Sequence, residues 1–141
     1  MSIWKTELTV PQLQAFMNNT LVEHLDIQIT EIGEDYVTAT MPVDQRTHQP
    51  MGILHGGASV VLAESLGSMA AQMAAEPGRA CVGLEINANH ISSVRSGRVM
   101  GKASPVHIGR STQVWDIKIS EDSGKTVCVS RLTMSVLGGG K

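Results

Sequence analysis

Aromatic residues are scarce in this chain. Two Trp, one Tyr and one Phe make up 3% of the 141 residues, so few side chains could stack on nucleic-acid bases. An excess of basic charge is also missing. The formal net charge is −2, whereas a nucleic-acid-binding surface is normally basic. Both shortages argue against a nucleic-acid partner.

Cysteine is almost absent and no uninterrupted apolar run is long. Cys81 and Cys128 form no CxxC motif, and no basic segment followed by an apolar run opens the chain. We therefore expect no signal peptide, a reducing cytoplasmic location and free thiols. The longest apolar stretch, residues 58–75, carries Glu64 near its middle. A bilayer-spanning helix rarely contains such a carboxylate, so we expect no membrane partner.

Glycine and methionine are plentiful, with 14 and eight residues, and 42% of the chain is hydrophobic. This length and composition predict one domain with a buried core. We expect that domain to span residues 1–137, followed by a flexible tail at 138–141, where three glycines precede Lys141.

Two segments have the signals of helices. Thr9-Val10-Pro11 predicts the start of a short helix that ends at Asn18-Asn19. Residues 57–75 predict one long helix, stopped by Pro77-Gly78. Its apolar residues occupy nearly every side, so we expect it to be buried all round.

The remaining segments predict strands joined by short turns. In one of them, Gln113, Trp115, Ile117 and Ile119 alternate with residues such as Asp116 and Lys118. No helix separates the last four strands. The expected fold class is therefore α+β, with an antiparallel sheet wrapped around the long helix. The expected strands span residues 26–32, 36–43, 80–91, 98–106, 112–120 and 125–137.

Glu64 is the most informative residue, because it interrupts an apolar helix. Desolvating a carboxylate costs several kcal/mol unless a partner compensates, so its position indicates a catalytic role. The structural alternative is a Glu that snorkels to solvent or pairs with Arg or Lys. Ser68, one turn later, lies on the same helix face and could hydrogen-bond the carboxylate or a nearby water.

The segment His55-Gly56-Gly57 precedes the same helix. Backbone N–H groups at a helix start are unpaired, the helix dipole favours negative charge, and glycine permits close approach. These features suit a developing oxyanion. An ordinary loop-to-helix junction would show the same residues, and His55 could be structural.

The spacing of these two features has a further consequence. Gly56 and Glu64 are separated by about 12 Å along a helix, at about 1.5 Å per residue. One reacting carbonyl cannot lie within about 3 Å of both groups on one helix. If both act on one substrate, each must come from a different subunit, which predicts a symmetric homodimer with shared sites.

Other candidates are weaker. The His residues show no metal-ligand spacing, so we expect no metal site, and neither a GxSxG motif nor a catalytic Cys context is present. Residues 107–112 combine a turn glycine, a cation and two hydroxyls, which suit a phosphate, and residues 90–95 have a similar character. Plain turns would account for either segment.

Taken together, the segment from Gln49 to Ser59, with Glu64 and Ser68, resembles the hotdog-fold acyl-CoA thioesterases. The resemblance is to the branch that contains phenylacetate-pathway, enterobactin-proofreading and 1,4-dihydroxy-2-naphthoyl-CoA thioesterases, the last acting in menaquinone biosynthesis. It extends through residues 85–90 and 107–110 and covers nearly the whole chain.

The resemblance implies hydrolysis of aryl- or acyl-CoA thioesters by a homotetramer built from dimers, without a cofactor. Glu64 would act as general base or nucleophile, and Gly56 N–H would hold the thioester oxygen. Gln49 and His55 would orient the carbonyl, and Ser68 would position the water or the carboxylate. The residues implied to line the CoA groove are Gly83, His90, Ile91, Ser92, Ser93, His107, Ile108, Gly109, Arg110, Ser111 and Thr112.

Two alternatives remain at this point. A hydratase or dehydratase of the same fold would also act on acyl thioesters, although those enzymes typically place a bulky residue and a proline after the histidine. A non-catalytic CoA-binding module is the other, and it would leave a buried Glu unexplained.

Overall fold

Alternating apolar residues decide which face of each strand packs on the helix. In β5 (Thr112–Glu121), Gln113, Trp115, Ile117 and Ile119 are buried, whereas Lys118 on the other face is exposed. The same alternation in the neighbouring strands gives the sheet one apolar face. The alternation predicted from the sequence is therefore confirmed.

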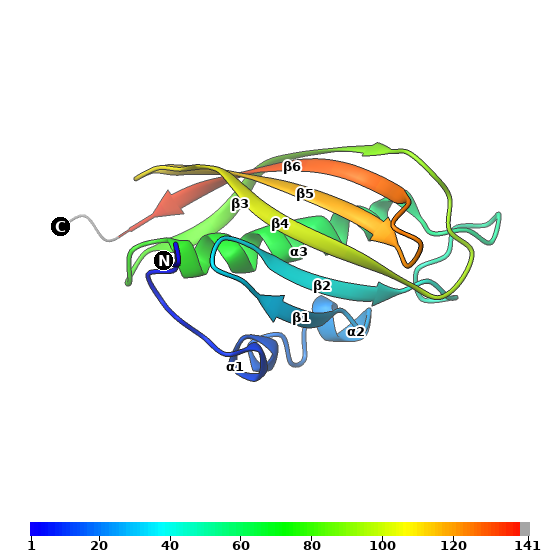
Figure 1. Ribbon diagram of the computed structural model, residues 1–141, viewed down its shortest axis with the longest axis horizontal. Helices are drawn as coiled ribbons and strands as arrows, with labels where there is room; N and C mark the ends of the chain where they lie inside the picture. Colours follow the sequence, from blue (N-terminus) through cyan, green and yellow to red (C-terminus); the bar gives the residue numbers. More distant parts are fainter. Residues whose placement is uncertain (139–141) are drawn as a thin grey trace.

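The computed structural model describes residues 1–138, and Figure 1 shows the sheet curving around the long helix α3 (Gly56–Ala74). All strand pairs are antiparallel, in the order β1-β2-β4-β5-β6-β3. The expected α+β class and each of the six expected strands are confirmed. The remaining strands are β1 (Gln28–Ile32), β2 (Val37–Pro42), β3 (Ala80–His90), β4 (Arg98–Ile108) and β6 (Thr126–Leu137).

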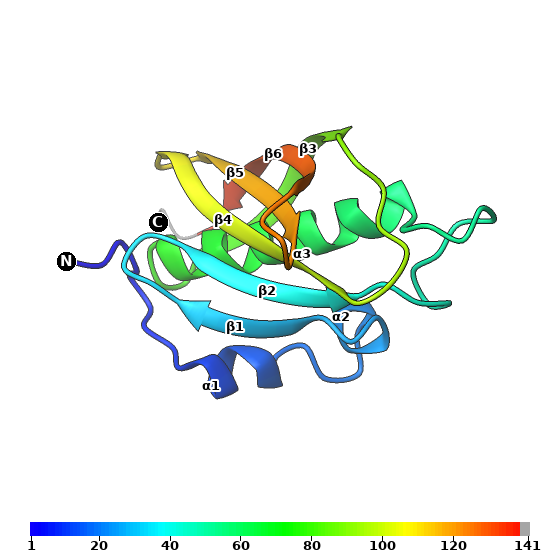
Figure 2. The ribbon, with the colours of Figure 1, turned by 45° about the vertical axis from the view of Figure 1, so that its right-hand side comes forward.

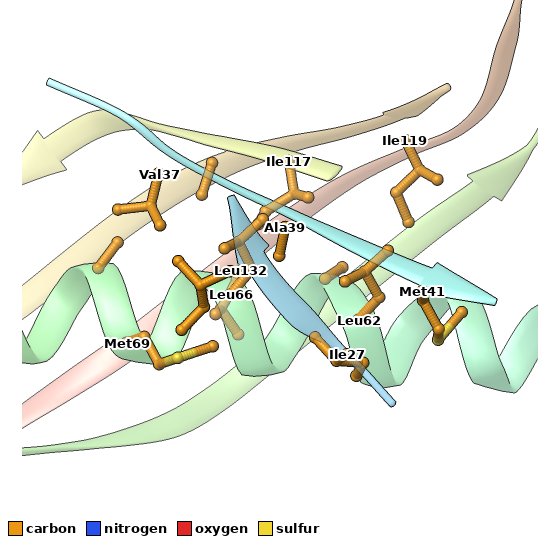
Figure 3. Packing of buried hydrophobic residues seen from close by; sticks show 14 of the residues in the cluster. Ile27, Val37, Ala39, Met41, Leu62, Leu66, Met69, Ile117, Ile119 and Leu132 are labelled. Carbon is orange, nitrogen blue, oxygen red and sulfur yellow. The ribbon is translucent and has the colours of Figure 1, made fainter. Parts of the chain in front are cut away.

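One side of α3 forms the centre of the core. Leu62 and Leu66 are fully buried between the helix and the sheet (Figure 3). Gly67 lets the sheet come close, because a Cβ there would lie 2.6 Å from Leu132 Cδ2. Small residues on α3 thus replace the bulk that aromatic residues would otherwise supply.

The expectation that α3 is buried all round is wrong for the chain by itself. The sheet covers one side of the helix only, so a stripe on the other side stays accessible (Figure 2). The stripe repeats at intervals of three and four residues, as one helix face requires. Its half-buried members are Val61, Glu64, Ser65 and Ser68, and its exposed member is Gln72.

The N-terminal helices differ from the prediction. α1 (Val10–Ala15) begins at a Thr9 capping box as expected but ends before Asn18-Asn19. A second helix, α2 (Leu21–His24), was not expected, because four residues are too short for a periodic pattern. The Gln14 side chain ties α1 to β1, donating to Ile27 O at 3.1 Å and accepting from Ile29 N at 2.7 Å.

β6 ends at Leu137, and most of the expected tail, residues 139–141, lies outside the described residues. No helix in the described part of the chain is long and apolar enough to cross a bilayer.

One buried polar network connects the sheet to α3, and it generates a stability prediction. Gln113 is fully buried; its Nε2 donates to Ala71 O at 3.2 Å and its Oε1 accepts from Trp115 Nε1 at 2.7 Å. In Gln113→Leu the Trp115 indole N–H loses its acceptor, at a cost of about 1–3 kcal/mol in the free energy of unfolding, whereas Ala71 O keeps its bond from Ala75 N. Urea denaturation measures the loss, and Gln45→Leu, at an exposed position, should leave the midpoint unchanged.

Candidate active site

Glu64 lines a cavity with a volume of about 750 Å³. The carboxylate is half-buried, and within residues 1–138 no side chain forms a hydrogen bond or ion pair with it. Pairing with Arg or Lys, one of the two structural alternatives, is therefore not found among residues 1–138. An unpaired carboxylate facing a cavity is free to accept a proton from a bound molecule.

Gly83 of β3 lies directly against this carboxylate. A Cβ on Gly83 would collide with Glu64 Oε2, so glycine is what lets the carboxylate lie against the strand. The resemblance to hotdog-fold thioesterases implied that Gly83 lines the CoA groove, but it did not indicate the contact with Glu64. Ser68 shares the cavity, but its Oγ is directed to Met134 Sδ at 3.7 Å and makes no hydrogen bond to Glu64.

The start of α3 has the geometry of an anion site. His55 is the N-cap, and its Nδ1 accepts from Gly57 N–H at 2.8 Å, which leaves the ring proton on Nε2. Among residues 1–138, no acceptor takes the Gly56 N–H. The His90 ring lies over Gly56, where a Cβ would be 2.8 Å from His90 Nε2.

A tight loop holds Gln49 beside this helix start. Gly52 N donates to Gln49 O at 2.9 Å, with Gly52 at φ +77°, and the Gln49 Oε1 accepts from Met51 N. His55 N closes the loop on Thr47 O at 2.8 Å. The Gln49 amide Nε2 keeps its donors, since nothing among the described residues accepts from it.

The segment after β3 completes the surroundings of Gly56. Leu54 N donates to Val94 O at 2.8 Å, which places residues 91–93 beside the helix start. A second cavity of about 370 Å³ lies there. It is lined by Gly56, His90, Ile91, Ser92 and Ser93, together with Ile53, Leu54, Ser59 and Val127.

Residues 107–112 lie at the opposite end of α3. Gly109 N donates to Thr112 O at 2.9 Å in the β4–β5 turn, and Arg110 borders a third cavity of about 310 Å³. Arg79 lines the same cavity and donates to Arg110 O at 3.0 Å. Sequence reasoning missed this second cation, whose only local signal is its place after Pro77-Gly78.

A single chain therefore separates the predicted site residues into three places along α3. Gln49, His55 and residues 90–93 surround Gly56 at the helix start. Glu64, Ser68 and Gly83 lie at its middle, and residues 107–112 lie beyond its end. Because 19 residues of helix span about 28 Å at about 1.5 Å per residue, one copy cannot bring these groups to one substrate carbonyl.

Neither cysteine has the environment of a nucleophile. Cys81 and Cys128 are free thiols, and burial raises the pKa of both above the ordinary value for Cys, which lowers the thiolate fraction. Within residues 1–138, no three His, Cys, Asp or Glu side chains cluster in a way that could hold a metal ion.

Comparison with known proteins decides the family. The model of the thioesterase superfamily matches residues 51–128, which include both the helix start and Glu64. The chain belongs to this superfamily. It is 52% identical over 135 residues to the 1,4-dihydroxy-2-naphthoyl-CoA hydrolase of Escherichia coli, covering 96% of this chain and 99% of that protein.

Two further relatives agree. A proofreading thioesterase of Cronobacter turicensis is 50% identical over 136 residues, covering 96% of this chain and 99% of the relative. The crystal structure of a thioesterase from Haemophilus influenzae superposes with a TM-score of 0.94 at 51% identity, covering 96% of this chain and 95% of that one. The expected hotdog fold and thioester hydrolysis are confirmed, in preference to a hydratase or a passive CoA-binding module.

The contact between Gly83 and Glu64 can be tested by adding one methyl group. In Gly83→Ala the new Cβ displaces the carboxylate, and a misplacement of about 1 Å can lower turnover about 100-fold. We expect kcat for a CoA thioester to fall by that factor, while the thermal unfolding midpoint stays close to that of the unsubstituted protein. Unchanged kcat would show that the position of Glu64 does not matter.

Proposed function

We propose that this chain hydrolyses aromatic acyl-CoA thioesters to the free acid and CoA, in active sites shared by two copies. The observation that carries the proposal is Glu64, a carboxylate with no partner among residues 1–138, in a large, mainly apolar cavity. An apolar cavity of this size suits a ring system. The name of the Escherichia coli relative supports 1,4-dihydroxy-2-naphthoyl-CoA or a related aromatic acyl-CoA as substrate, which implies a cytoplasmic step of menaquinone biosynthesis.

In this proposal the helix start stabilises the charge that develops on the thioester oxygen. The Gly56 N–H donates to that oxygen, and the positive end of the α3 dipole favours its negative charge. Gln49 Nε2 and His55 Nε2 are further donors at the same end of α3. All three groups are present before substrate arrives, so little reorganisation is needed.

Glu64 supplies the other half of the reaction. As general base, its carboxylate takes a proton from water while the water oxygen bonds to the carbonyl carbon; the C–S bond then breaks and the CoA sulfur receives the proton. As nucleophile, it attacks the same carbon, the C–S bond breaks, and CoA leaves as a thiolate that takes a proton from water; a second water then hydrolyses the resulting anhydride to the free acid and restores the Glu64 carboxylate. Both routes need the same position for Glu64, and neither requires a metal or a separate cofactor.

The CoA portion extends from the carbonyl across the remaining candidate residues. His90, Ile91, Ser92 and Ser93 lie beside Gly56 and suit the pantetheine arm. The turn from His107 to Thr112 carries Arg110, with Arg79 beside it, and two guanidinium groups suit the phosphates of CoA.

The free edge of β3 supports a dimer. β3 is the last strand of the sheet, it is 11 residues long, and it exposes Val82 and Leu84. Proteins rarely leave such an edge unpaired. An antiparallel pairing of two β3 strands centred near Ile86 and Asn87 brings Gly83 of one copy to His90 of the other. Since Gly83 touches Glu64 and His90 covers Gly56, the pairing assembles the two half-sites.

We further propose that two such dimers form a tetramer. Met100 is 42% exposed on the face of the sheet that points away from α3, and apolar exposure of this kind can be buried against a second dimer.

The catalytic role of Glu64 is tested by thiol release from a panel of CoA thioesters. Loss of a general base typically lowers kcat about 100- to 10,000-fold, so we expect Glu64→Ala to fall within that range. Glu7→Gln, which changes an exposed carboxylate, should retain full turnover. A Glu64→Ala protein as active as the unsubstituted one would assign the reaction to another residue.

The shared site is tested by mixing two inactive variants. Glu64→Gln and Gln49→Ala remove groups that we assign to different copies of each site, so a mixed dimer has one intact site. Random mixing should restore about one quarter of the original turnover. If both groups acted within one copy, every site in the mixture would carry a lesion, and no activity would return.

A further inference from the structure

The cavity next to Glu64 has two chemically different walls. One is formed by α3, which presents the polar side chains of Glu64, Ser65, Ser68 and Gln72 beside the apolar side chains of Val61, Met69 and Met73. The other comes from the chain before β1 and is apolar. This N-terminal wall consists of Leu8, Leu13, Phe16, Met17, Leu21 and Val22.

The N-terminal wall is anchored independently of α3's accessible stripe. Gln14 holds α1 against β1 through two hydrogen bonds of 3.1 and 2.7 Å. Nearer the N-terminus, before α1, the N–H groups of Lys5 and Thr6 donate to Met73 O at 2.9 and 3.1 Å. Both attachments leave the Phe16 and Leu21 side chains 68% and 55% exposed at the cavity. Apolar side chains with this exposure gain stability when an apolar ligand covers them.

The wall also lies outside the part of the chain that carries the family signature. The superfamily model begins at residue 51, whereas α1 and α2 end at residues 15 and 24. The elements that perform hydrolysis and the elements that line the far side of the cavity are thus separate in the sequence. Substitutions in the wall can change which molecule fits without moving Glu64 or Gly56.

We propose that the N-terminal wall selects the acyl group, holding the ring of a hydroxylated aromatic acyl group against the copy that supplies Glu64. Phe16 and Met17 contact the ring faces, because aromatic and thioether side chains pack well on aromatic rings. The ring hydroxyls face Ser65 and Ser68 on α3. This inference rests on the proposed hydrolysis of aromatic acyl-CoA at the same site.

The test compares one aromatic and one short aliphatic substrate. In Phe16→Ala, kcat/KM for 1,4-dihydroxy-2-naphthoyl-CoA should fall at least about 10-fold, and for butanoyl-CoA less than about twofold, because the shorter chain does not reach the wall. Met17→Ala should likewise lower the ratio of kcat/KM for the aromatic substrate to kcat/KM for butanoyl-CoA. Asn18→Ala, at the next residue but outside the cavity lining, should leave both values unchanged.

A binding measurement separates selection from chemistry. An inert analogue of 1,4-dihydroxy-2-naphthoyl-CoA, with a methylene between carbonyl and sulfur, should bind Phe16→Ala about 10-fold more weakly than it binds the unsubstituted protein. Free CoA should bind the two proteins equally well. Equal losses for both substrates, or equal weakening of analogue and CoA, would overturn the role of the wall. If the unsubstituted protein hydrolysed neither thioester, the proposed function would fail instead, and the analogue would still report on the wall.

Discussion

Close packing of one side of α3 on the sheet is the constraint on which the rest of the structure depends. Leu62, Leu66 and Gly67 fill the space beneath the sheet, and Gly67 meets Leu132 so closely that no Cβ fits without movement. Because the sheet covers only that side, every third or fourth residue of α3 remains accessible. An otherwise apolar helix can carry Glu64 because this residue belongs to the accessible stripe, where the carboxylate is not fully removed from water.

The same helix is also the reason for proposing that the site draws on more than one copy. Its N-terminus offers an unpaired N–H and a favourable dipole, but the carboxylate lies two turns further along. A rigid helix cannot fold back to unite the two. The edge strand β3 contacts both half-sites, with Gly83 at Glu64 and His90 at Gly56. Symmetric pairing of two β3 strands would therefore place the half-sites of two copies side by side. In the proposed dimer, the rigid helix separates the two half-sites within each copy, and pairing of the β3 edges brings half-sites of two copies together.

Local sequence signals predicted those residues whose role can be inferred from their immediate neighbours in the sequence. Glu64 interrupts an apolar run, and two glycines mark the helix start, so both could be found without a structure. The alternation in β5 was equally visible. Contacts across the fold could not be predicted in this way: nothing near Gly83 indicates that a carboxylate lies against it, and nothing near Arg79 indicates Arg110. The single-sided burial of α3 was missed because apolar residues occupy nearly every side of the helix, and only the sheet decides which side is covered.

Under these proposals, one segment of the chain carries out the hydrolysis and a different segment selects the acyl group. The segment that matches the superfamily holds the helix start, Glu64 and β3, and the distances among these groups tolerate little change, as the close contact at Gly83 illustrates. The N-terminal wall has a different tolerance, since Phe16 and Leu21 are largely exposed and pack little within the chain. Substitutions at Phe16 or Leu21 cost little folding stability but alter the surface that meets the acyl group. A thioesterase of this architecture can therefore acquire a new acyl preference through its N-terminal segment while its catalytic geometry stays fixed.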